Sequence, residues 1–458
     1  GVAVTQYRVN GGAWQSYSSP FSVSGDGTHQ VEFRSTDVAG NQEGVKSLQI
    51  KIDTAPPTTT ATPSGTAGSN GWWRSSVQVA LAATDGTSGV AVTQYRVNGG
   101  AWQSYSSPFS VSGDGTHQVE FRSTDVAGNQ ETIRTLTVRI DTTPPTTTAT
   151  PSGTAGNGGW WRSSVQVALA ATDGTSGVAV TQYRVDGGAW QSYSSPFSVS
   201  GDGTYQVEFR STDVAGNQET IRTLTVRIDT TPPASFIVSP GDGQWVRGTI
   251  NLAGNASDAT SGVASVSWSG DNGVTWQTAS GTTSWTATWN TTAGPDGDYR
   301  ICSRADDVAG NRQSPVCITV HVDNTPPTTT ATPSGTTGSN GWWQSDVRVT
   351  LAASDGMGIG VEETEYNLDN SGWQPYSGPF TVSGDGIHTI RYRSRDWLGN
   401  QETEGTLQVR IDTVPPMTTI TPSGVAGSNG WYISDVQVAL SASDATSGVD
   451  ATRYRVDG

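Results

Sequence analysis

Apolar and polar residues alternate along short stretches of this chain, and glycine-rich turns separate the stretches. Within residues 56–143 the alternation covers residues 77–81, 94–97, 118–122 and 136–140. A period of two residues is typical of strands that bury one face and expose the other. No stretch has a helical period. The pattern predicts an all-β protein.

The turns between these stretches set the number of strands. Asn98-Gly99-Gly100 supplies the positive φ angles of a hairpin turn. Further strands are expected at residues 58–62, 101–105 and 109–112, which gives seven short strands in fewer than ninety residues. Seven such strands predict a two-sheet, immunoglobulin-like β-sandwich. A solenoid is the alternative, and it is disfavoured because solenoid repeats are usually much shorter.

Nearly the same sequence occurs three times. Residues 1–43 are identical to residues 89–131, and residues 177–219 differ from them only at Asp186 and Tyr205. A fixed-period repeat indicates a tandem array of small domains. The Asp-Thr-x-Pro-Pro marker, which reads Asp-Asn-Thr-Pro-Pro at residues 323–327, divides the array into a partial domain (1–55), two repeats (56–143 and 144–231), a divergent repeat (232–325), a further repeat (326–414) and a second partial domain (415–458).

The two partial domains are complementary parts of one sandwich. Residues 415–458 align with residues 56–99, and residues 1–55 align with residues 89–143. Either the chain is a window of a longer array, or successive copies join head to tail by strand addition. We favour the window, because both partial domains carry the third strand and a splice between copies would not need it twice.

The repeated residues resemble those of a known group of domains. Tyr-Arg-Val-Asn-Gly-Gly-x-Trp, the Asp-Val-Ala-Gly-Asn turn and the terminal Ile-Asp-Thr-x-Pro-Pro are similar to bacterial immunoglobulin-like (Big-type) repeats. The resemblance covers essentially the whole chain, and residues 232–325 look like a different subtype. It implies a module that occurs in tandem in secreted hydrolases and in surface or adhesion proteins, where it mostly acts as a spacer.

Composition excludes several partners. The chain has 41 acidic and 25 basic residues, for a formal charge of −16, and no basic stripe, so nucleic acid is not an expected partner. No stretch is long and apolar enough for a transmembrane helix, so no membrane insertion is expected in this segment. No catalytic set is present either. His29, His117 and His388 occupy one slot of the repeat, which Tyr205 fills in another copy, and a tyrosine cannot replace a general base.

The two cysteines lie in the divergent repeat. Cys302 and Cys317 flank the turn at residues 307–311 almost symmetrically, which places them opposite one another on neighbouring strands. This arrangement predicts a cross-strand disulfide and an oxidising, extracellular setting. Two buried free thiols are the alternative.

Aspartates recur at three positions of each repeat. In a seven-stranded sandwich, the loop after the second strand and the loop before the last strand lie at the same end of the domain. The preceding repeat ends at this same end, so all three positions meet at one domain junction. Three carboxylates with nearby carbonyl oxygens suit Ca²⁺; the alternative is that each aspartate caps its own turn. The predicted sets are Asp53, Asp85 and Asp125; Asp141, Asp173 and Asp213; Asp229, Asp258 and Asp307; Asp323, Asp355 and Asp396; and the pair Asp412 and Asp444.

Tryptophans form a second recurring feature. Adjacent residues of a strand face opposite ways, so one ring of each Trp pair should enter the core and the other should face solvent or the next domain. Packing in the core or at a junction is the favoured role; stacking on a sugar ring is the alternative. The candidates for aromatic contact are Trp72, Trp73, Trp160, Trp161, Trp342, Trp343 and Trp431.

These features predict a non-enzymatic, extracellular or cell-surface structural array of immunoglobulin-like domains, such as a stalk, a fibre or an adhesin spacer. Its expected partners are its own flanking domains or other copies of the chain, and polysaccharide is a further candidate. Calcium is the one cofactor considered. The alternatives are a carbohydrate-binding accessory region of a secreted hydrolase, favoured if exposed tryptophans line one face, and a self-assembling extracellular filament.

Overall fold

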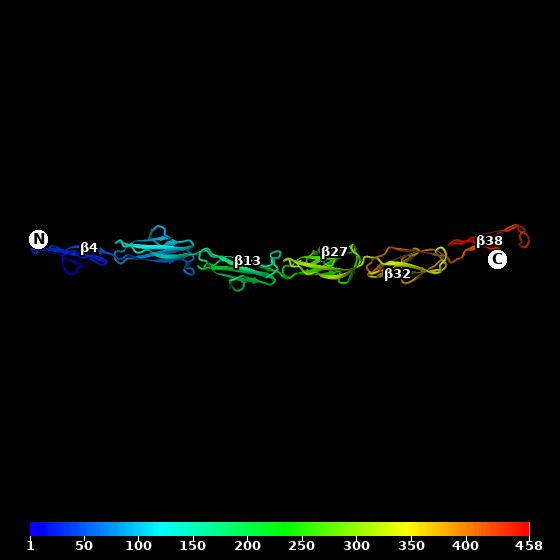
Figure 1. The fold of residues 1–458 in the computed structure, drawn as a ribbon, viewed down its shortest axis with the longest axis horizontal. Coiled ribbons are helices and arrows are strands. Elements are labelled where there is room, and N and C mark those ends of the chain that lie inside the picture. Colours follow the sequence, from blue (N-terminus) through cyan, green and yellow to red (C-terminus); the bar gives the residue numbers. More distant parts are fainter. Residues whose placement is uncertain (458) are drawn as a thin grey trace. The chain divides into compact units, whose positions relative to one another are not determined.

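The computed structural model describes residues 1–457, and its regular secondary structure is almost entirely β-strand (Figure 1). The chain divides into two compact units, which are described separately. The first comprises residues 1–155 and 159–229, and the second comprises residues 156–158 and those from 230 onward. Within the described residues no helix has the length and apolarity that crossing a membrane requires.

Residues 56–143 form a two-sheet sandwich. A three-stranded sheet has the order β10-β7-β5, and a five-stranded sheet has the order β6-β12-β11-β8-β9. All neighbouring strands are antiparallel except β6 and β12, which are parallel. The strands are β5 (Thr58–Ser64), β6 (Trp72–Trp73), β7 (Val77–Thr84), β8 (Val90–Val97), β9 (Gln103–Ser104), β10 (Phe109–Val111), β11 (Gly115–Asp125) and β12 (Arg134–Ile140).

The core of this sandwich follows from the alternation in the sequence. Val77 and Val79 of β7 have no exposed surface, whereas Gln78 between them is exposed. They pack with Val119 of β11 and Val138 of β12, which come from the other sheet. Each sheet therefore buries the apolar face that its period of two provides.

The predicted strands differ from the observed ones in detail. Residues 101–105 contribute only the two-residue strand β9, which pairs with β8 at the edge of the five-stranded sheet. The double-tryptophan segment adds an eighth strand, β6, whose two residues pair with Arg139 and Ile140. A pairing of two residues is too short to be recognised as a strand from alternation.

Residues 144–231 repeat this arrangement. Their sheets have the orders β13-β15-β18 and β14-β20-β19-β16-β17, and Val165, Val167, Val207 and Val226 lie in the core. The strands are β13 (Thr146–Ser152), β14 (Trp160–Trp161), β15 (Val165–Thr172), β16 (Val178–Val185), β17 (Gln191–Ser192), β18 (Phe197–Val199), β19 (Gly203–Asp213) and β20 (Arg222–Ile228).

The divergent repeat, residues 232–325, has a larger first sheet. Its sheets have the orders β21-β23-β27-β26 and β22-β29-β28-β24-β25, and Trp268 and Trp285 are buried between them. A single 3₁₀ turn, η1 (Thr291–Ala293), follows β27. The strands are β21 (Ala234–Ser239), β22 (Gln244–Val246), β23 (Thr249–Ser257), β24 (Val263–Ser269), β25 (Gln277–Thr278), β26 (Ser280–Gly281), β27 (Ser284–Asn290), β28 (Gly297–Asp307) and β29 (Val316–Val322).

Residues 326–414 return to the first pattern, with the sheet orders β30-β32-β35 and β31-β37-β36-β33-β34. Their core contains Val347, Val349, Ile390 and Ile411. The strands are β30 (Thr328–Ser334), β31 (Trp342–Trp343), β32 (Val347–Ser354), β33 (Val361–Leu368), β34 (Gln374–Pro375), β35 (Phe380–Val382), β36 (Gly386–Asp396) and β37 (Gly405–Ile411).

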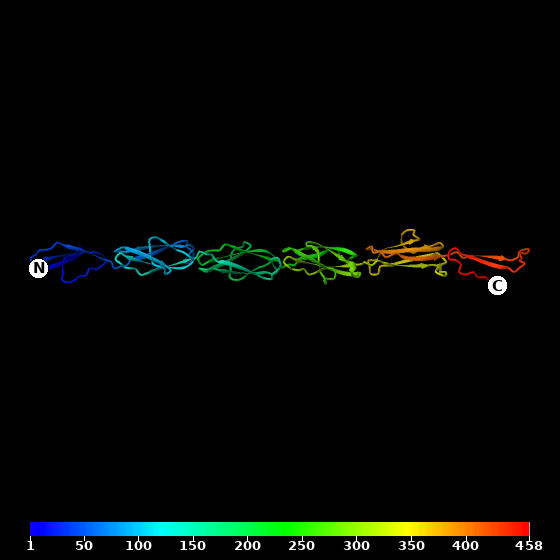
Figure 2. The ribbon, with the colours of Figure 1, turned by 90° about the horizontal axis from the view of Figure 1, so that it is seen from above.

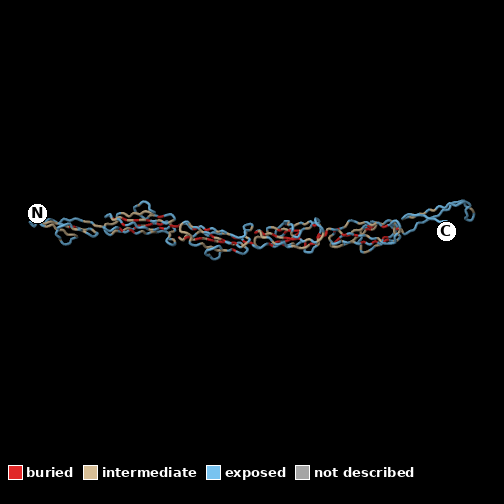
Figure 3. The backbone as a smooth tube through the Cα atoms, in the orientation of Figure 1, coloured by how far each residue is buried: buried red, intermediate tan, exposed pale blue. Residues whose placement is uncertain are grey.

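The two end segments each form one sheet. The first has the order β2-β1-β3-β4 and the last pairs β38 with β39, so the strands of each lie in one layer (Figure 2). Buried residues concentrate in the four complete repeats, and residues 412–457 have none (Figure 3). The strands are β1 (Val2–Val9), β2 (Gln15–Ser16), β3 (Gly27–Asp37), β4 (Lys46–Ile52), β38 (Met417–Ser423) and β39 (Gln437–Ser443).

Candidate functional site: aspartate clusters between repeats

Strand ends bring the first set of aspartates together. Asp53 follows β4, Asp85 follows β7 and Asp125 is the last residue of β11. One carboxylate oxygen from each lies within 4.8 Å of the others. Asp53 belongs to the end segment, and the other two belong to the repeat that follows it. The cluster therefore spans a junction between repeats.

The same geometry recurs within each compact unit. In the first unit Asp141, Asp173 and Asp213 form a second cluster, and in the second unit Asp323, Asp355 and Asp396 form another. Asp229 belongs to the first unit, and Asp258 and Asp307 belong to the second, so they are described by their local contacts. Asp258 accepts hydrogen bonds from the backbone N–H groups of Thr260 and Gly262, and Asp307 from those of Gly310 and Asn311.

Two of the three carboxylates in each cluster hold their own turns. Oδ2 of Asp85 accepts hydrogen bonds from the backbone N–H groups of Thr87 (2.9 Å) and Gly89 (2.8 Å). Oδ1 of Asp125 accepts one from the N–H of Asn129 at 2.8 Å. These are the contacts that the turn-capping alternative predicts. The same aspartates therefore cap their own turns and also contribute carboxylates to the cluster.

The third carboxylate bonds across the junction. Oδ2 of Asp53 accepts a hydrogen bond from the N–H of Ser88, and Oδ2 of Asp141 accepts one from that of Ser176, at 2.9 and 3.0 Å. In the second unit, Oδ2 of Asp323 accepts one from the N–H of Ile359 at 2.9 Å. Each last-strand aspartate is thus fixed to a loop of the following repeat.

One carboxylate oxygen is buried without a donor. Oδ1 of Asp173 has no hydrogen-bond partner and is shielded from solvent. None of the nine carboxylates in the three clusters forms an ion pair with a lysine or arginine of the described residues. A buried anionic oxygen without a donor or cation is costly. The donor set, which consists of oxygen atoms only, fits a hard divalent cation such as Ca²⁺.

The carboxylates around Asp355 repel one another. Burial raises the pKa of Asp355, and the charges of Asp323 and Asp396 raise it further, against the opposing hydrogen bond from the N–H of Gly360. Gly358 lies against this cluster, since a Cβ there would collide with carboxylate oxygens of Asp355 and Asp323. The carboxylates are therefore packed closely around a small space.

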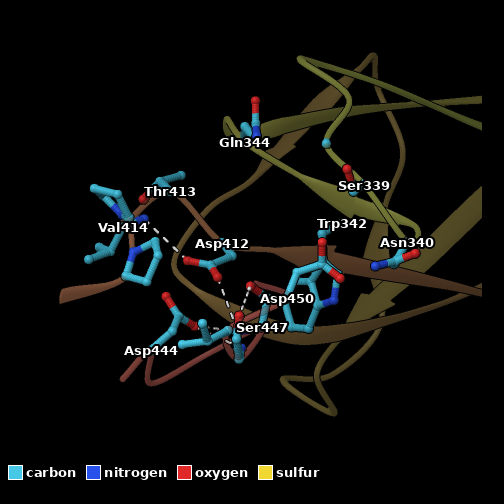
Figure 4. Close-up of a pocket in the computed structure, with 15 residues that line it drawn as sticks. Ser339, Asn340, Trp342, Gln344, Asp412, Thr413, Val414, Asp444, Ser447 and Asp450 are labelled. Atoms are coloured by element: carbon cyan, nitrogen blue, oxygen red, sulfur yellow. Dashed lines mark hydrogen bonds between the residues drawn. The ribbon is translucent and has the colours of Figure 1, made fainter. Parts of the chain in front are cut away.

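The pair Asp412 and Asp444 lies at the last junction. Both carboxylates point toward Ser447 in Figure 4, and its N–H donates to Oδ2 of Asp412 (3.0 Å) and to Oδ1 of Asp444 (2.8 Å). Trp342 lines the same cavity, which also includes Val414. The sequence predicts only this pair of carboxylates for the last junction, and the structure places both of them there.

The paired tryptophans divide between core and junction. Trp73, Trp161 and Trp343 pack against the cores of their repeats. Their neighbours Trp72, Trp160 and Trp342 are half-buried. Trp431, in the single-layered end segment, is 76% exposed. Among the described residues, the tryptophan pairs of the complete repeats contain no fully exposed ring, so they form no exposed aromatic row.

A second set of junction contacts leaves no clear signal in the sequence. The N–H of Ser69 donates to the carbonyl of Ala215 at 2.8 Å, and Nδ2 of Asn70 donates to the carbonyl of Val214 at 3.0 Å. The loop before a tryptophan pair thus docks on the Asp-Val-Ala-Gly-Asn turn of the next repeat. The glycine- and asparagine-rich composition of that loop was the only available signal, and it is equally typical of a free loop.

The cysteines lie on adjacent strands of the divergent repeat. Cys302 of β28 is directly opposite Cys317 of β29, with Cα atoms 4.0 Å and sulfur atoms 2.00 Å apart. The bond therefore connects two neighbouring strands of the five-stranded sheet. The described residues contain no free cysteine.

Comparisons with known families agree with this architecture. Residues 66–142 and 156–230 match a bacterial Ig-like domain family, residues 233–302 match the bacterial Ig domain family, and residues 283–354 match the bacterial Ig-like domain family of group 3. Together with the two-sheet sandwiches, the matches define a tandem array of immunoglobulin-like domains. The matched residues therefore form bacterial Ig-like (Big) domains arranged in tandem.

Several solved structures are similar to the chain. The fibronectin(III)-like modules of Clostridium thermocellum CbhA share 19% identity over 39% of this chain and 94% of theirs, with a TM-score of 0.23. The endo-beta-1,4-mannanase from Thermotoga petrophila shares 17% over 21% of each chain (TM-score 0.19), and Sidekick-1 immunoglobulin domains 1–5 share 11% over 89% and 91% (TM-score 0.28). No curated protein matches the chain.

Proposed function

We propose that the chain is a non-enzymatic, extracellular structural spacer whose domain junctions bind Ca²⁺. The observation that carries this proposal is the recurring cluster of three carboxylates, contributed by two successive repeats and lacking a basic partner. Domains of the Big family are generally non-catalytic and typical of extracellular or surface proteins, which supports the same role.

A cation would act at a junction by binding both repeats at once. Asp141 comes from one repeat, whereas Asp173 and Asp213 come from the next. Bound Ca²⁺ would relieve the repulsion among the three and use Oδ1 of Asp173, which has no donor in the protein. The two repeats would then be held more rigidly, and a spacer needs that property to keep its ends apart.

A carbohydrate-binding region of a secreted hydrolase is the second candidate. The half-burial of Trp72, Trp160 and Trp342 favours the structural role, because a ring that stacks on a sugar must expose one face. Trp102 is not free either, since the guanidinium groups of Arg96 and Arg122 lie 4.7 and 4.2 Å from its ring centre. A binding assay on insoluble polysaccharides tests this candidate directly.

The metal site is tested by one matched pair of variants. Asp173→Asn removes a negative charge from a cluster, and an amide oxygen can still accept from Thr175 and Gly177. Asp186→Asn removes a charge from an exposed hairpin of the same repeat, and it restores the residue that Asn98 provides in another copy. Calcium titration calorimetry should show one fewer bound ion for Asp173→Asn and no change for Asp186→Asn.

The spacer role is tested separately from metal binding. Small-angle X-ray scattering of the chain in EDTA and in Ca²⁺ should give a larger or more sharply defined maximum dimension with the ion. Saturating Ca²⁺ should also raise the thermal midpoint, since a ligand at about 100 times its Kd adds roughly 2.7 kcal/mol to the free energy of unfolding. Equal dimensions and midpoints in both buffers would reject calcium stiffening, whereas binding to a polysaccharide would reject a purely structural role.

A further inference from the structure

A cavity lies between the divergent repeat and the repeat that follows it. Its volume is about 690 Å³, which is in the range of ligand-binding pockets. Trp245 of β22 lines the cavity from the divergent repeat, and Met357, in the loop after β32, lines it from the next repeat. Both repeats are complete two-sheet sandwiches within the same compact unit. Both walls of the cavity therefore belong to complete domains.

The wall of the divergent repeat contains a row of three side chains on one sheet. Asp298 of β28 lies opposite His321 of β29, and His321 lies opposite Trp245 of β22. Nδ1 of His321 is 2.5 Å from Oδ1 of Asp298, and the centres of the imidazole and indole rings are 4.8 Å apart. The core residues Val320 and Val322 flank His321 along β29, so the row lies on the outer face of the sheet.

The other complete repeats carry different charges in this row. They keep the tryptophan, but an arginine stands at the place of His321 and an uncharged residue at the place of Asp298. The arginines are Arg139, Arg227 and Arg410, and the uncharged residues are Thr116, Thr204 and Ile387. The divergent repeat has thus lost a permanent positive charge and gained a carboxylate beside an aromatic ring. This change favours a cationic ligand.

The wall of the next repeat differs from the other copies as well. The segment Gly356-Met357-Gly358-Ile359 replaces the Gly-Thr-Ser sequence of residues 86–88 and 174–176. Met357 is 91% exposed, although it lines the cavity. Its thioether is flexible and polarisable, and it can adapt to an apolar group placed beside it. Trp245 and Met357 therefore offer apolar contact surface from two successive repeats.

Carboxylates supply the charge of the cavity. Asp296, Asp298 and Asp355 line it, and its lining within the described residues contains no lysine or arginine. The side chain of Asp298 is 73% exposed, so a ligand can reach its carboxylate. An aromatic ring, a thioether and an excess of carboxylates together match a cation that is carried on an apolar stem.

We propose that this cavity binds an arginine or lysine side chain of a partner protein. The charged group would lie at Asp298 and Asp296, because hydrogen bonds to an ionised group are the strongest ones. The aliphatic stem would pack between Trp245 and Met357, as the stems of basic residues do on apolar surfaces. The formal charge of −16 on the chain would attract a basic partner and speed its association.

Methionine NMR observes the cavity directly. The chain has two methionines, so isotopic labelling of their methyl groups gives one probe in the cavity, Met357, and one internal reference, Met417 of β38. Acetyl-arginine amide should shift the Met357 signal in a saturable manner and leave that of Met417 in place. Acetyl-citrulline amide has a similar shape without the charge and should bind about tenfold more weakly. An unmoved Met357 signal, or equal affinities for the two amides, would overturn the proposal.

Substitutions taken from the other repeats test the charged row. Asp298→Thr and His321→Arg introduce the residues that the repeat 56–143 has in the same fold. Each should weaken the binding of acetyl-arginine amide about tenfold, because one removes a carboxylate and the other adds a cation. Asp306→Thr is the matched control, since it also removes one negative charge and introduces a residue of that repeat, but it lies outside the cavity. An equal loss in the control would mean that only the overall charge matters, and would overturn the proposal.

Two further arms identify the source of the cation and separate the cavity from the metal clusters. Putrescine is a free diamine, and a stronger response of Met357 to putrescine than to the amide would overturn binding of a protein side chain; a response to neutral oligosaccharides alone would do the same. All titrations are made in EDTA and at a fixed Ca²⁺ concentration. Asp355 also belongs to a proposed metal cluster, whereas Asp298 does not. Binding in EDTA therefore tests the cavity alone, and Ca²⁺ should weaken it without abolishing it.

Discussion

The side-chain amide of Asn400 donates a hydrogen bond to the backbone carbonyl of Asp323, 3.0 Å away, although Asp323 ends the preceding repeat. The same side chain accepts a hydrogen bond from Arg247 of that repeat at 3.1 Å and donates to Asp396 of its own. Both Asn400 and Asp323 are buried. One asparagine therefore connects two repeats and positions two carboxylates of the cluster.

Asn400→Ala should loosen this junction. The substitution leaves the buried carbonyl of Asp323 without this partner, and an unsatisfied buried group costs about 1–3 kcal/mol. We expect faster amide hydrogen exchange in the loop around Ile359 and lower thermal stability of the repeat 326–414. Gln401→Ala, at the exposed neighbouring position, is the control and should leave both measurements unchanged.

The disulfide should contribute measurably to the divergent repeat. Replacing Cys302 and Cys317 by alanine removes a cross-link between residues separated by 15 positions. A loop of this size is expected to contribute about 3 kcal/mol through the entropy of the unfolded chain. Chemical denaturation followed by the fluorescence of the buried Trp268 and Trp285 measures the change. Reduction of the unmodified chain should reproduce it, and a double variant as stable as the unmodified chain would contradict this role.

Sequence periodicity predicted the sandwich well, because burial of one strand face produces alternation. The aspartate sets were also predictable, since topology places strand ends and loops at the same edge. The docking of Asn70 on Val214 was not predictable, because it depends on a loop conformation that leaves no periodic signal. The same holds for Glu131, a turn residue whose side chain reaches back to Thr59 in the other sheet. The role of a polar residue whose partner is distant in sequence can be identified only from the folded structure.

The pair of His388 and Asp369 should make one repeat sensitive to pH. Burial disfavours the charged form of the His388 ring and by itself lowers its pKa. Hydrogen bonds to Asp369 (2.7 Å) and to the carbonyl of Gly384 have the larger combined effect, so the pKa of His388 is raised. Because the folded-state pKa is raised, the stabilisation is fully present below the ordinary histidine pKa and is lost as the pH rises through the folded value.

An NMR titration of His388 measures this effect. Asp369→Asn gives the turn the residue that Asn98 provides in another copy, and it should lower the pKa of His388 because the negative partner is gone. The pH dependence of the stability of the repeat 326–414 should decrease in parallel. An unchanged titration in the variant would show that Asp369 does not control the ring.

Asp355→Asn distinguishes a metal site from a set of turn caps. Burial and the charges of Asp323 and Asp396 raise the pKa of Asp355, so its charged form is unfavourable in the metal-free fold. Folding is therefore favoured as the pH falls through the raised pKa, and it is disfavoured above that value. Without Ca²⁺ the neutral amide should leave the repeat as stable as before or about 0.5 kcal/mol more stable, after allowance for solvent screening.

With Ca²⁺ the order should reverse. The unmodified chain gains stability from the ion, and Asp355→Asn should lose that gain at its own junction because a charged ligand is missing. Asp385→Asn is the control, since Asp385 bonds to Thr413 at 2.9 Å and lies outside the cluster; its response to Ca²⁺ should be that of the unmodified chain. Calorimetric scans of the three proteins in EDTA and in Ca²⁺ give the comparison. A variant Asp355→Asn that is destabilised in EDTA and still responds fully to Ca²⁺ would mean that the carboxylate serves only its turn.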